Sequence, residues 1–548
     1  MKRREKAALS ILLALMLFAS MAVSAFAASA EKGNGYPVIC IHGFGAAKIY
    51  QDYGTSKERD LMKIDTADFS KDLGYAKLLG EVLAITDQNA QKHVDADQLI
   101  DDLAALAREF NTDCDENGDA PADTGIHPWN EPVSRHMDWF GDDPSSLSGE
   151  TAYVYRIGKA IGFDKTYQFW YDSRLDGVEN GRRLDQYIDL VKKQQHTDKV
   201  NIVGDSEGTV VMSGYAYYHY KDNEVANMCF VDGAFEGFEL NSLLAGDVSL
   251  TAEGMQRFLV VLSRTLKNGK YEPLIRTAQT LLDSNIDGLM NYGREIQSSP
   301  RLLKRVLMEI CYPAFGHVPI LYEFIPYHNF DRMTKLLSES GYLDTSSGLY
   351  RKLSRYHKVQ GAVPETLKKL KENGVQVSVL ADYGFPGIPV TSAQNNQTDL
   401  LIDTCFASAG ATTADYGSRL AQKEGKYLEP NRQIDASTCA LPDNTWFIRD
   451  IIHTLYDTDS ETLGFVTALT IGAVPTDLAS VKRELGYGQY LYGDRQQDLH
   501  NVNDAADTDP YCHPETGDLN YDPLKVSVSS LTIDPDLGTS PRLYLSTK

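Results

Sequence analysis

Short apolar runs alternate with amphipathic stretches along the middle of the chain. Five runs rich in β-branched and aromatic residues predict buried strands, at residues 38–41, 167–171, 200–203, 228–231 and 375–380. Helical patterns lie between them: one apolar face repeats at residues 184, 187, 188 and 191, and a second helix is expected at 209–218. Strands that alternate with helices predict an α/β fold, with a mostly parallel sheet covered by helices on both faces.

Two long segments interrupt this alternation. Residues 46–160 are highly charged and contain a patch rich in Gly, Asp and Pro, which predicts an irregular insertion. Residues 236–368 carry apolar stripes at helical spacing, such as Leu303, Val306, Leu307 and Ile310, which predict a helical cap or lid. The core would then comprise residues 28–235 and 369–490, followed by a polar tail at 491–548 with one strand-like run at 526–533.

The first residues have the pattern of an export signal. Four basic side chains (Lys2, Arg3, Arg4 and Lys6) precede an apolar run at 7–23 and the small-x-small sequence Ala25-Phe26-Ala27. Residues 1–27 are therefore expected to be a cleaved signal peptide, and the mature protein to be secreted. Removing these four basic residues and one acidic residue takes the formal charge from -23 to -26, which argues against binding to nucleic acid or to anionic lipid by charge.

Cysteine spacing and acidic motifs give no indication of a metal or other cofactor. The seven cysteines include no C-x-x-C pair, so neither a zinc site nor a redox motif is expected; Cys405 and Cys439 are candidates for a disulfide. Residues 113–119 match the first half of an EF-hand calcium loop, but the twelfth position is Thr124, where that loop needs a bidentate Glu. A solvated acidic turn is the favoured interpretation.

A candidate nucleophile follows the third predicted strand. Gly204-Asp205-Ser206-Glu207-Gly208 fits G-x-S-x-G, between a strand at 200–203 and a helix that begins at about Thr209. This strand–turn–helix context is the one that the motif requires, because the serine sits on a strained turn and the flanking chain approaches too closely for side chains at both glycines. The pattern predicts Ser206 as a nucleophile.

The loop after the first strand supplies a candidate oxyanion hole. His42-Gly43-Phe44-Gly45 follows residues 38–41 directly, and backbone N–H groups from such a loop act with the N–H after the nucleophile. Phe44 and Glu207 are therefore the expected donors through their main chain. His42 is expected to be structural, because the catalytic histidine comes last in the usual chain order.

The same order places the acid and the base late in the chain. His453, His500 and His513 lie late enough, and His453 is favoured because it follows the aromatic run Trp446-Phe447-Ile448 rather than lying in the polar tail. Asp382, Asp399 and Asp403 are the candidate acids, and the pattern alone does not choose among them.

Four blocks resemble the lecithin:cholesterol acyltransferase and related phospholipase group of the α/β hydrolases. They are residues 37–45, the segment Phe169-Trp170-Tyr171-Asp172-Ser173-Arg174-Leu175, residues 198–206, and residues 374–391 with the Tyr383-Gly384 pair. The resemblance implies an α/β-hydrolase fold, an acid after the Tyr-Gly block in a D-x-x-apolar context, and lipid or other acyl-ester substrates. Asp399 fits that context best and Asp403 is the reserve. The implied activity is that of a secreted serine esterase, lipase or O-acyltransferase with a lid that opens in transient contact with lipid interfaces.

Two alternatives stay open at this stage. Gly204-Asp205-Ser206 also resembles the G-D-S block of the SGNH hydrolases, and Asp450-Ile451-Ile452-His453 fits their D-x-x-H, which would make Asp450 the acid. The other alternative is a hydrolase-fold protein without catalysis that serves as an exported binding protein. Asp205 and Glu207 motivate it, because two carboxylates beside an oxyanion are unfavourable unless they point away or are paired.

Overall fold

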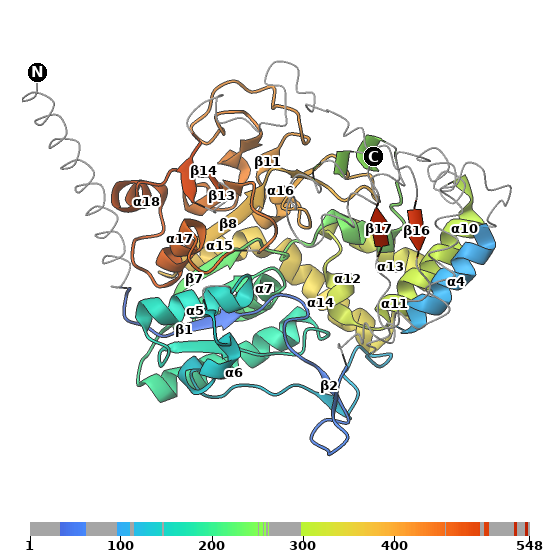
Figure 1. Cartoon of the computed structure of the whole chain (residues 1–548), viewed down its shortest axis with the longest axis horizontal. Coiled ribbons are helices and arrows are strands. Elements are labelled where there is room, and N and C mark those ends of the chain that lie inside the picture. The colour runs from blue at the N-terminus through green and yellow to red at the C-terminus, as the bar shows by residue number, and fades with distance from the viewer. Residues whose placement is uncertain are drawn as a thin grey trace, which may run out of the picture.

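An eight-stranded sheet forms the centre of the computed structural model, in the order β15-β14-β13-β8-β7-β6-β1-β5 (Figure 1). Neighbouring strands are parallel, except that β15 is antiparallel to β14. The structure describes residues 33–61, 96–109, 114–144, 147–249, single positions between 251 and 261, 298–454, 456–493, 498–502, 531–533 and 543–545. The strands of the sheet are β1 (Val38–Ile41), β5 (Thr166–Phe169), β6 (Val200–Asp205), β7 (Val225–Val231), β8 (Gln376–Tyr383), β13 (Thr445–Arg449), β14 (Tyr490–Gly493) and β15 (Leu499–Asn501).

The five strands expected from the apolar runs are all present, and they lie side by side as β5, β1, β6, β7 and β8. The α/β class and the mostly parallel sheet are confirmed. The structure differs at the expected boundary after residue 490, because β14 and β15 extend the sheet into the segment that the sequence assigned to a polar tail. Only the last residues of the run expected at 526–533 are described as a strand, β16 (Leu531–Ile533), which pairs with β17 (Leu543–Leu545).

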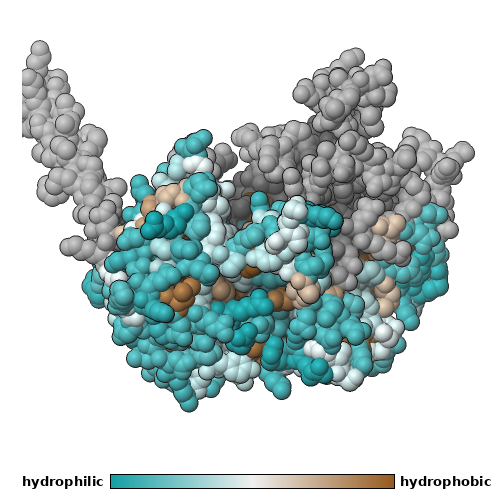
Figure 2. Space-filling view, turned by 90° about the horizontal axis from the view of Figure 1, so that it is seen from below, coloured by the Kyte–Doolittle hydropathy of each residue, from teal (hydrophilic) through white to brown (hydrophobic). Residues whose placement is uncertain are grey.

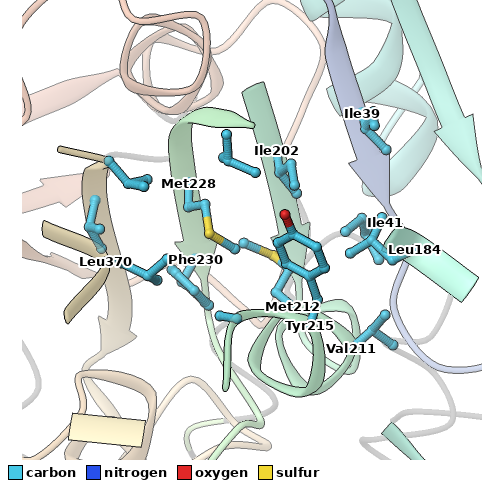
Figure 3. Close-up of a cluster of buried hydrophobic side chains, with 14 of the residues drawn as sticks. Ile39, Ile41, Leu184, Ile202, Val211, Met212, Tyr215, Met228, Phe230 and Leu370 are labelled. Carbon is cyan, nitrogen blue, oxygen red and sulfur yellow. The ribbon is translucent and has the colours of Figure 1, made fainter. Parts of the chain in front are cut away.

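Alternate residues of each central strand point to opposite faces of the sheet, and each face has its own apolar core. On one face, Ile39, Ile202 and Met228 pack against α6 (Gly177–Gln195), α7 (Gly208–His219) and α15 (Val363–Glu372) (Figure 3). On the other face, the neighbouring strand residues pack against α5 (Glu150–Ile161), α17 (Glu461–Thr470) and α18 (Leu478–Leu485). Helices therefore cover both faces, as a buried parallel sheet requires.

The expected insertion at 46–160 does not end where the pattern suggested, because α5 lies within it and belongs to the helical cover of the sheet. Its helix α4 (Ala96–Glu109) instead packs on the expected cap, against α10 (Pro300–Arg305) and the π-helical segment η5 (Val306–Cys311). The guanidinium group of Arg301 donates to the two carboxylate oxygens of Asp97 at 2.6 and 2.7 Å. Next to this pair, Ile100 of α4 packs on Leu302 of α10. The two insertions thus meet at one side of the molecule, at the right of Figure 1.

The remaining described cap helices are α11 (Tyr312–Phe315), α12 (Pro319–Glu323), α13 (Phe330–Glu339) and α14 (Gly348–Gly361). They share a small apolar core of their own, and α14 also packs on α6 and α7. The surface in Figure 2 is mostly hydrophilic, with separate apolar spots, in keeping with the acidic composition.

Several sequence expectations concern the chain ends and the thiols. Residues 1–27 lie outside the described residues. Within the described part of the chain, no helix is long and apolar enough to cross a membrane. Cys405 and Cys439 are both free thiols, so the disulfide considered for them is not formed.

Candidate active site

Ser206 lies on the sharp turn between β6 and α7, at the carboxyl edge of the sheet. Its backbone has a φ of 50°, a left-handed conformation that costs energy for a residue with a side chain. The two glycines of the motif are required sterically. A Cβ atom on Gly204 would lie 2.5 Å from the sulfur of Met212, and one on Gly208 would lie 2.6 Å from the carbonyl oxygen of Ile41. The strand–turn–helix context expected for the motif is therefore present.

A row of hydrogen bonds joins Ser206, His453 and Asp399, which are far apart in the sequence. The Nε2 atom of His453 lies 2.9 Å from the Oγ atom of Ser206, and its Nδ1 atom lies 2.7 Å from an oxygen of Asp399. The backbone N–H of His453 also donates to the carbonyl oxygen of Asp399, at 2.9 Å. The structure thus brings together the three side chains that the sequence nominated as nucleophile, base and acid.

Asp399 is held by its own loop. Its second carboxylate oxygen accepts from the backbone N–H groups of Leu401 and Ile402 at 2.9 and 2.7 Å, and the side chain is 1% exposed. These donors fix one oxygen toward the loop and leave the other for the imidazole. A carboxylate in this position selects the tautomer with the proton on Nδ1, which leaves Nε2 free to accept a proton from Ser206.

The other candidate acids have different partners. Asp403 accepts from the backbone N–H of Glu239 and from Asn396, at 2.8 and 2.7 Å. Asp382 contacts Tyr456, at 2.7 Å. Asp450 pairs with Arg449 at 3.2 Å, so the SGNH-type pairing of Asp450 with His453 is wrong for this structure.

The late histidines considered as alternatives to His453 lie elsewhere. His500 is on β15, the edge strand of the sheet, where its ring lies 5.0 Å from that of Tyr492. His513 is outside the described residues.

The loop after β1 lies against the nucleophile. A Cβ atom on Gly43 would be 3.3 Å from the Cβ atom of Ser206, so the next residue, Phe44, begins beside the serine. Among the described residues, neither the backbone N–H of Phe44 nor that of Glu207 donates to a protein acceptor. Two unengaged N–H groups therefore flank Ser206, as an oxyanion hole needs.

The ring of His42 packs against residues that follow β5. Its buried ring stacks on Tyr171 with ring centres 4.0 Å apart, and its Nε2 atom accepts from the backbone N–H of Tyr171 at 3.3 Å. Burial lowers the pKa of His42 to about 4, so the ring is neutral at physiological pH. It holds the start of the loop that carries Phe44.

The two carboxylates of the turn are both buried. Glu207 is 0% exposed and neither of its oxygens has a hydrogen-bond partner among the described residues. Burial, with the nearby carboxylates of Asp172 and Glu323, raises the pKa of Glu207 well above its ordinary value, which favours its neutral form. Burial likewise raises the pKa of Asp205 to about 7, although His453 opposes the rise. A Glu207 side chain held in its neutral form would not repel an oxyanion.

His453 is surrounded by acidic groups. Burial alone would lower its pKa, but Asp399, Asp232 and Asp205 together raise the pKa to about 9. The site therefore stabilises the imidazolium, which is the charge that forms when a histidine takes the proton of a serine.

Sequence reasoning missed Asp232 and Tyr456. Asp232 follows β7 directly, as Ser206 follows the adjacent strand β6, and its φ is 44°. Tyr456 lies three residues after His453 and its hydroxyl contacts Asp232 at 2.9 Å. The usable signal was an Asp-Gly pair directly after a buried strand, the position at which a parallel sheet places its functional side chains.

The acidic loop that matches the first half of a calcium loop, and for which a solvated turn was favoured, makes other contacts. Lys352 donates to the carbonyl oxygen of Gly118 and to the carboxylate of Asp119, both at 2.6 Å. Asn117 accepts from the backbone N–H of Gly348 at the start of α14, at 3.0 Å, and Asp113 lies outside the described residues. These contacts join the loop to α14, and the positive charge of Lys352 lies against its acidic side chain.

One surface cluster has carboxylates and a histidine at metal-ligand spacing. Asp185, His219, Asp222 and Glu224 each offer an atom within 4.8 Å of the others. Glu224 already pairs with the ammonium group of Lys192, which supplies the positive charge that a metal would bring.

No family model matches the chain, and no curated protein matches it. Among solved structures, it is similar to the one described as the crystal structure of the Tle4–Tli4 complex, with 10% sequence identity and a TM-score of 0.30. That similarity covers 81% of this chain and 98% of the other. A TM-score this low does not define a shared fold, and the geometry of the site is the evidence for function.

Proposed function

We propose that this protein is a serine hydrolase of the α/β-hydrolase type that cleaves carboxylic esters through an acyl-serine intermediate. The observation that supports this most directly is the unbroken row from Ser206 through His453 to Asp399. The chain order Ser, Asp, His and the strained serine after a central strand are both those of the α/β hydrolases.

In the proposed mechanism, His453 removes the proton of Ser206 as its oxygen attacks the ester carbonyl. Asp399 holds the ring in the productive tautomer and stabilises the imidazolium. The N–H groups of Phe44 and Glu207 donate to the developing oxyanion. His453 then passes its proton to the departing alkoxide, and water or a second alcohol attacks the acyl-serine to restore the enzyme.

Apolar side chains beside the triad support esters of apolar acids, lipid esters among them, as the substrate class. The exposed ring of Phe44 meets Phe324 edge to face at 6.1 Å, and Phe324 in turn packs on Phe238. Leu400 and Ile452, the neighbours of Asp399 and His453, pack on a second apolar cluster. Apolar side chains next to the reacting groups favour an apolar acyl group.

The first experiment is covalent labelling with a fluorophosphonate. Wild type should be labelled, Ser206→Ala should not, and Ser213→Ala, on the same helix, should be labelled as wild type is. Labelling should be tested at pH 9, where His453 is half neutral, as well as at pH 7. An unlabelled wild-type protein at both pH values would instead support the exported binding protein without catalysis.

The second experiment concerns the substrate. The kcat/KM for p-nitrophenyl esters should increase from acetate to octanoate, by roughly tenfold or more, because each added methylene that is buried contributes about 0.8 kcal/mol. Phe44→Ala should reduce this chain-length preference more than it reduces the rate on acetate. A preference for acetate in the wild-type protein would contradict the apolar acyl site. If activity rises when long esters form micelles, residues 236–368 act as a lid that opens at lipid interfaces.

We also propose that the chain is exported, on the strength of the basic, apolar and small-residue pattern at residues 1–27. The test is the N-terminal sequence of the protein recovered outside the producing cell, which should begin at Ala28.

A further inference from the structure

A second buried carboxylate lies beside the triad. One oxygen of Asp232, one of Asp399 and a ring nitrogen of His453 all lie within 4.8 Å of one another. Asp232 is 0% exposed and directly follows β7, whereas Asp399 directly follows the short strand β10 (Gln397–Thr398), beyond β8. The imidazole of His453 thus faces two carboxylates from two separate parts of the chain, although the proposed mechanism uses one.

Both oxygens of Asp232 are fixed by hydrogen bonds. The backbone N–H of Asp382 donates to one of them at 2.8 Å, and the hydroxyl of Tyr456 lies 2.9 Å from the other. The same hydroxyl lies 2.7 Å from a carboxylate oxygen of Asp382. Tyr456 therefore bridges two buried carboxyl groups with a single oxygen.

The number of protons in this bridge decides which carboxyl group is charged. A tyrosine hydroxyl has one hydrogen to donate, and an ionised carboxylate only accepts. Two short contacts from one hydroxyl to two carboxyl groups therefore require that one of them is protonated and donates to the tyrosine. Asp382 fits that part, because its other oxygen has no hydrogen-bond partner among the described residues, whereas both oxygens of Asp232 are bonded to donors. An unpaired oxygen costs less on a neutral acid than on an anion.

We propose that Asp232 is a positioning residue of the triad: an anion held beside His453 by a proton chain that runs from protonated Asp382 through Tyr456. It supports the imidazolium together with Asp399. The catalytic consequence rests on the proposed esterase function, whereas the charge arrangement does not.

The titration of the groups around the bridge agrees with this assignment. Burial, with the nearby Asp232 carboxylate, raises the pKa of Asp382 well above its usual range, although its bond with Tyr456 opposes the rise. Burial raises the pKa of Asp232 only to about 6, since His453, the N–H of Asp382 and Tyr456 all stabilise its anion. The charged or titratable groups that face this site from the surrounding elements are Asp205 on β6, Asp399, His453, Asp382 on β8, and Tyr153 on α5. Among them, His453 is the one that becomes a cation during the reaction.

A matched pair of substitutions separates the two carboxyl groups. Asn is a near-isosteric copy of a protonated Asp and can donate to Tyr456, so Asp382→Asn should leave the pKa of His453 unchanged. Asp232→Asn removes a negative charge within 4.8 Å of the ring and should lower that pKa by about one unit or more. The pKa is measured by NMR on protein labelled with 15N in its histidines, in a Ser206→Ala background. This readout needs no activity and is therefore independent of the proposed function.

Activity supplies the second readout. For the wild-type protein, kcat/KM should rise with pH as His453 loses its proton, and the midpoint of this rise, here called the limb, should lie near pH 9. Asp232→Asn should move the limb to lower pH with little change in KM. Asp399→Asn combined with Asp232→Asn should be at least tenfold less active than Asp399→Asn alone. Tyr456→Phe should shift the limb in the same direction as Asp232→Asn. Tyr153→Phe, whose buried hydroxyl has no partner in the described structure and whose ring packs on Tyr456 at 5.4 Å, should not.

The proposal is overturned if Asp232→Asn leaves the pKa of His453 at its wild-type value, or if Asp382→Asn shifts it as much. The second result would place the charge on Asp382. Should Asp232→Asn fail to fold, the comparison of Tyr456→Phe with Tyr153→Phe tests the same bridge, and equal pKa values of His453 in these two variants overturn it.

Discussion

At the scale of single residues, the site is built from side chains whose charge states are set by burial. Burial and nearby carboxylates raise the pKa of Glu207 and favour its neutral form, whereas three aspartates around His453 favour its cationic form. Removal from water disfavours the charged form of both groups, but the aspartates around His453 outweigh this effect, whereas the groups near Glu207 add to it. A G-x-S-x-G motif with two acidic residues is compatible with catalysis for this reason.

The roles of the residues are tested by comparing four substitutions. His453→Ala and Ser206→Ala should abolish ester turnover to the same degree, because a triad acts as a unit. Asp399→Asn should lower kcat by roughly two to four orders of magnitude, since one carboxylate typically contributes on the order of 10⁴ and Asp232 retains part of the stabilisation. Asp450→Asn should lose little, because its carboxylate pairs with Arg449.

The kcat of each variant is measured with p-nitrophenyl butyrate at pH 9, and its circular dichroism spectrum is the control for folding. A wild-type rate for Asp399→Asn together with an inactive Asp403→Asn would move the acid by four positions along the same loop. A wild-type rate for His453→Ala would exclude it as the base.

At the scale of elements, the five strands at residues 38–41, 167–171, 200–203, 228–231 and 375–380 were predictable because each is a short run rich in β-branched or aromatic residues. β14 was not, because Tyr490-Leu491-Tyr492-Gly493 is too short to show a period and is stabilised by its register against Phe447 and its neighbours on β13. Long-range pairing of this kind leaves no local signal. The choice of Asp399 depended on a family resemblance for the same reason, since the contact with His453 spans 54 positions.

Helix α7, which begins directly after the Ser206 turn, crosses α6 at close range. A Cβ atom on Gly214 would lie 2.2 Å from the carbonyl oxygen of Gly177, and one on Gly181 would lie 2.5 Å from the backbone nitrogen of Tyr215. Backbone atoms cannot move aside as side chains do. Gly214→Ala should therefore lower the free energy of unfolding by about 1–3 kcal/mol, as overpacked cores do, although alanine is the better helix former.

Urea unfolding provides the measurement, and α17 provides the control. Gly464→Ala would meet only the flexible end of Arg156, at 3.1 Å, so it should be neutral or stabilise the protein by up to about 1 kcal/mol. If Gly214→Ala is as stable as Gly464→Ala, the two helices do not cross as closely as described. A loss of ester turnover in a folded Gly214→Ala protein would show that the crossing also positions Ser206.

At the scale of the whole molecule, the buried carboxyl groups link stability to pH. Burial raises the pKa of Asp205 and Asp403 to about 7 and that of Glu236 to about 8, and it also raises the pKa of Glu207 well above its ordinary value. Between the unfolded value of about 4 and these folded values, the native protein binds more protons than the unfolded chain. The free energy of unfolding must then fall as the pH rises through this window.

His453 acts in the same direction. Its folded pKa of about 9 lies above the unfolded value, so its contribution is complete below about pH 6.5 and is lost as the pH rises toward 9. The backbone N–H of Ser480 donates to Asp477 and lowers the pKa of that carboxylate, so Asp477 stabilises the fold above about pH 4. Maximum stability is expected between these limits, at mildly acidic pH.

The prediction is a midpoint of thermal unfolding that is higher at pH 5.5 than at pH 8.5. Glu207→Gln removes one of the titrating groups while keeping its shape, so it should raise the midpoint at pH 8.5 and flatten the pH dependence. Glu365→Gln changes an exposed residue on α15 and is the matched control, so it should leave the pH dependence of the midpoint unchanged.

Ester turnover should rise with pH where stability falls, because His453 must be neutral to accept the proton of Ser206. A midpoint that rises from pH 5.5 to pH 8.5 would mean that the carboxyl groups near Ser206 are ionised in the folded protein. The assignment of a neutral form to Glu207, beside the proposed oxyanion hole, would then be wrong.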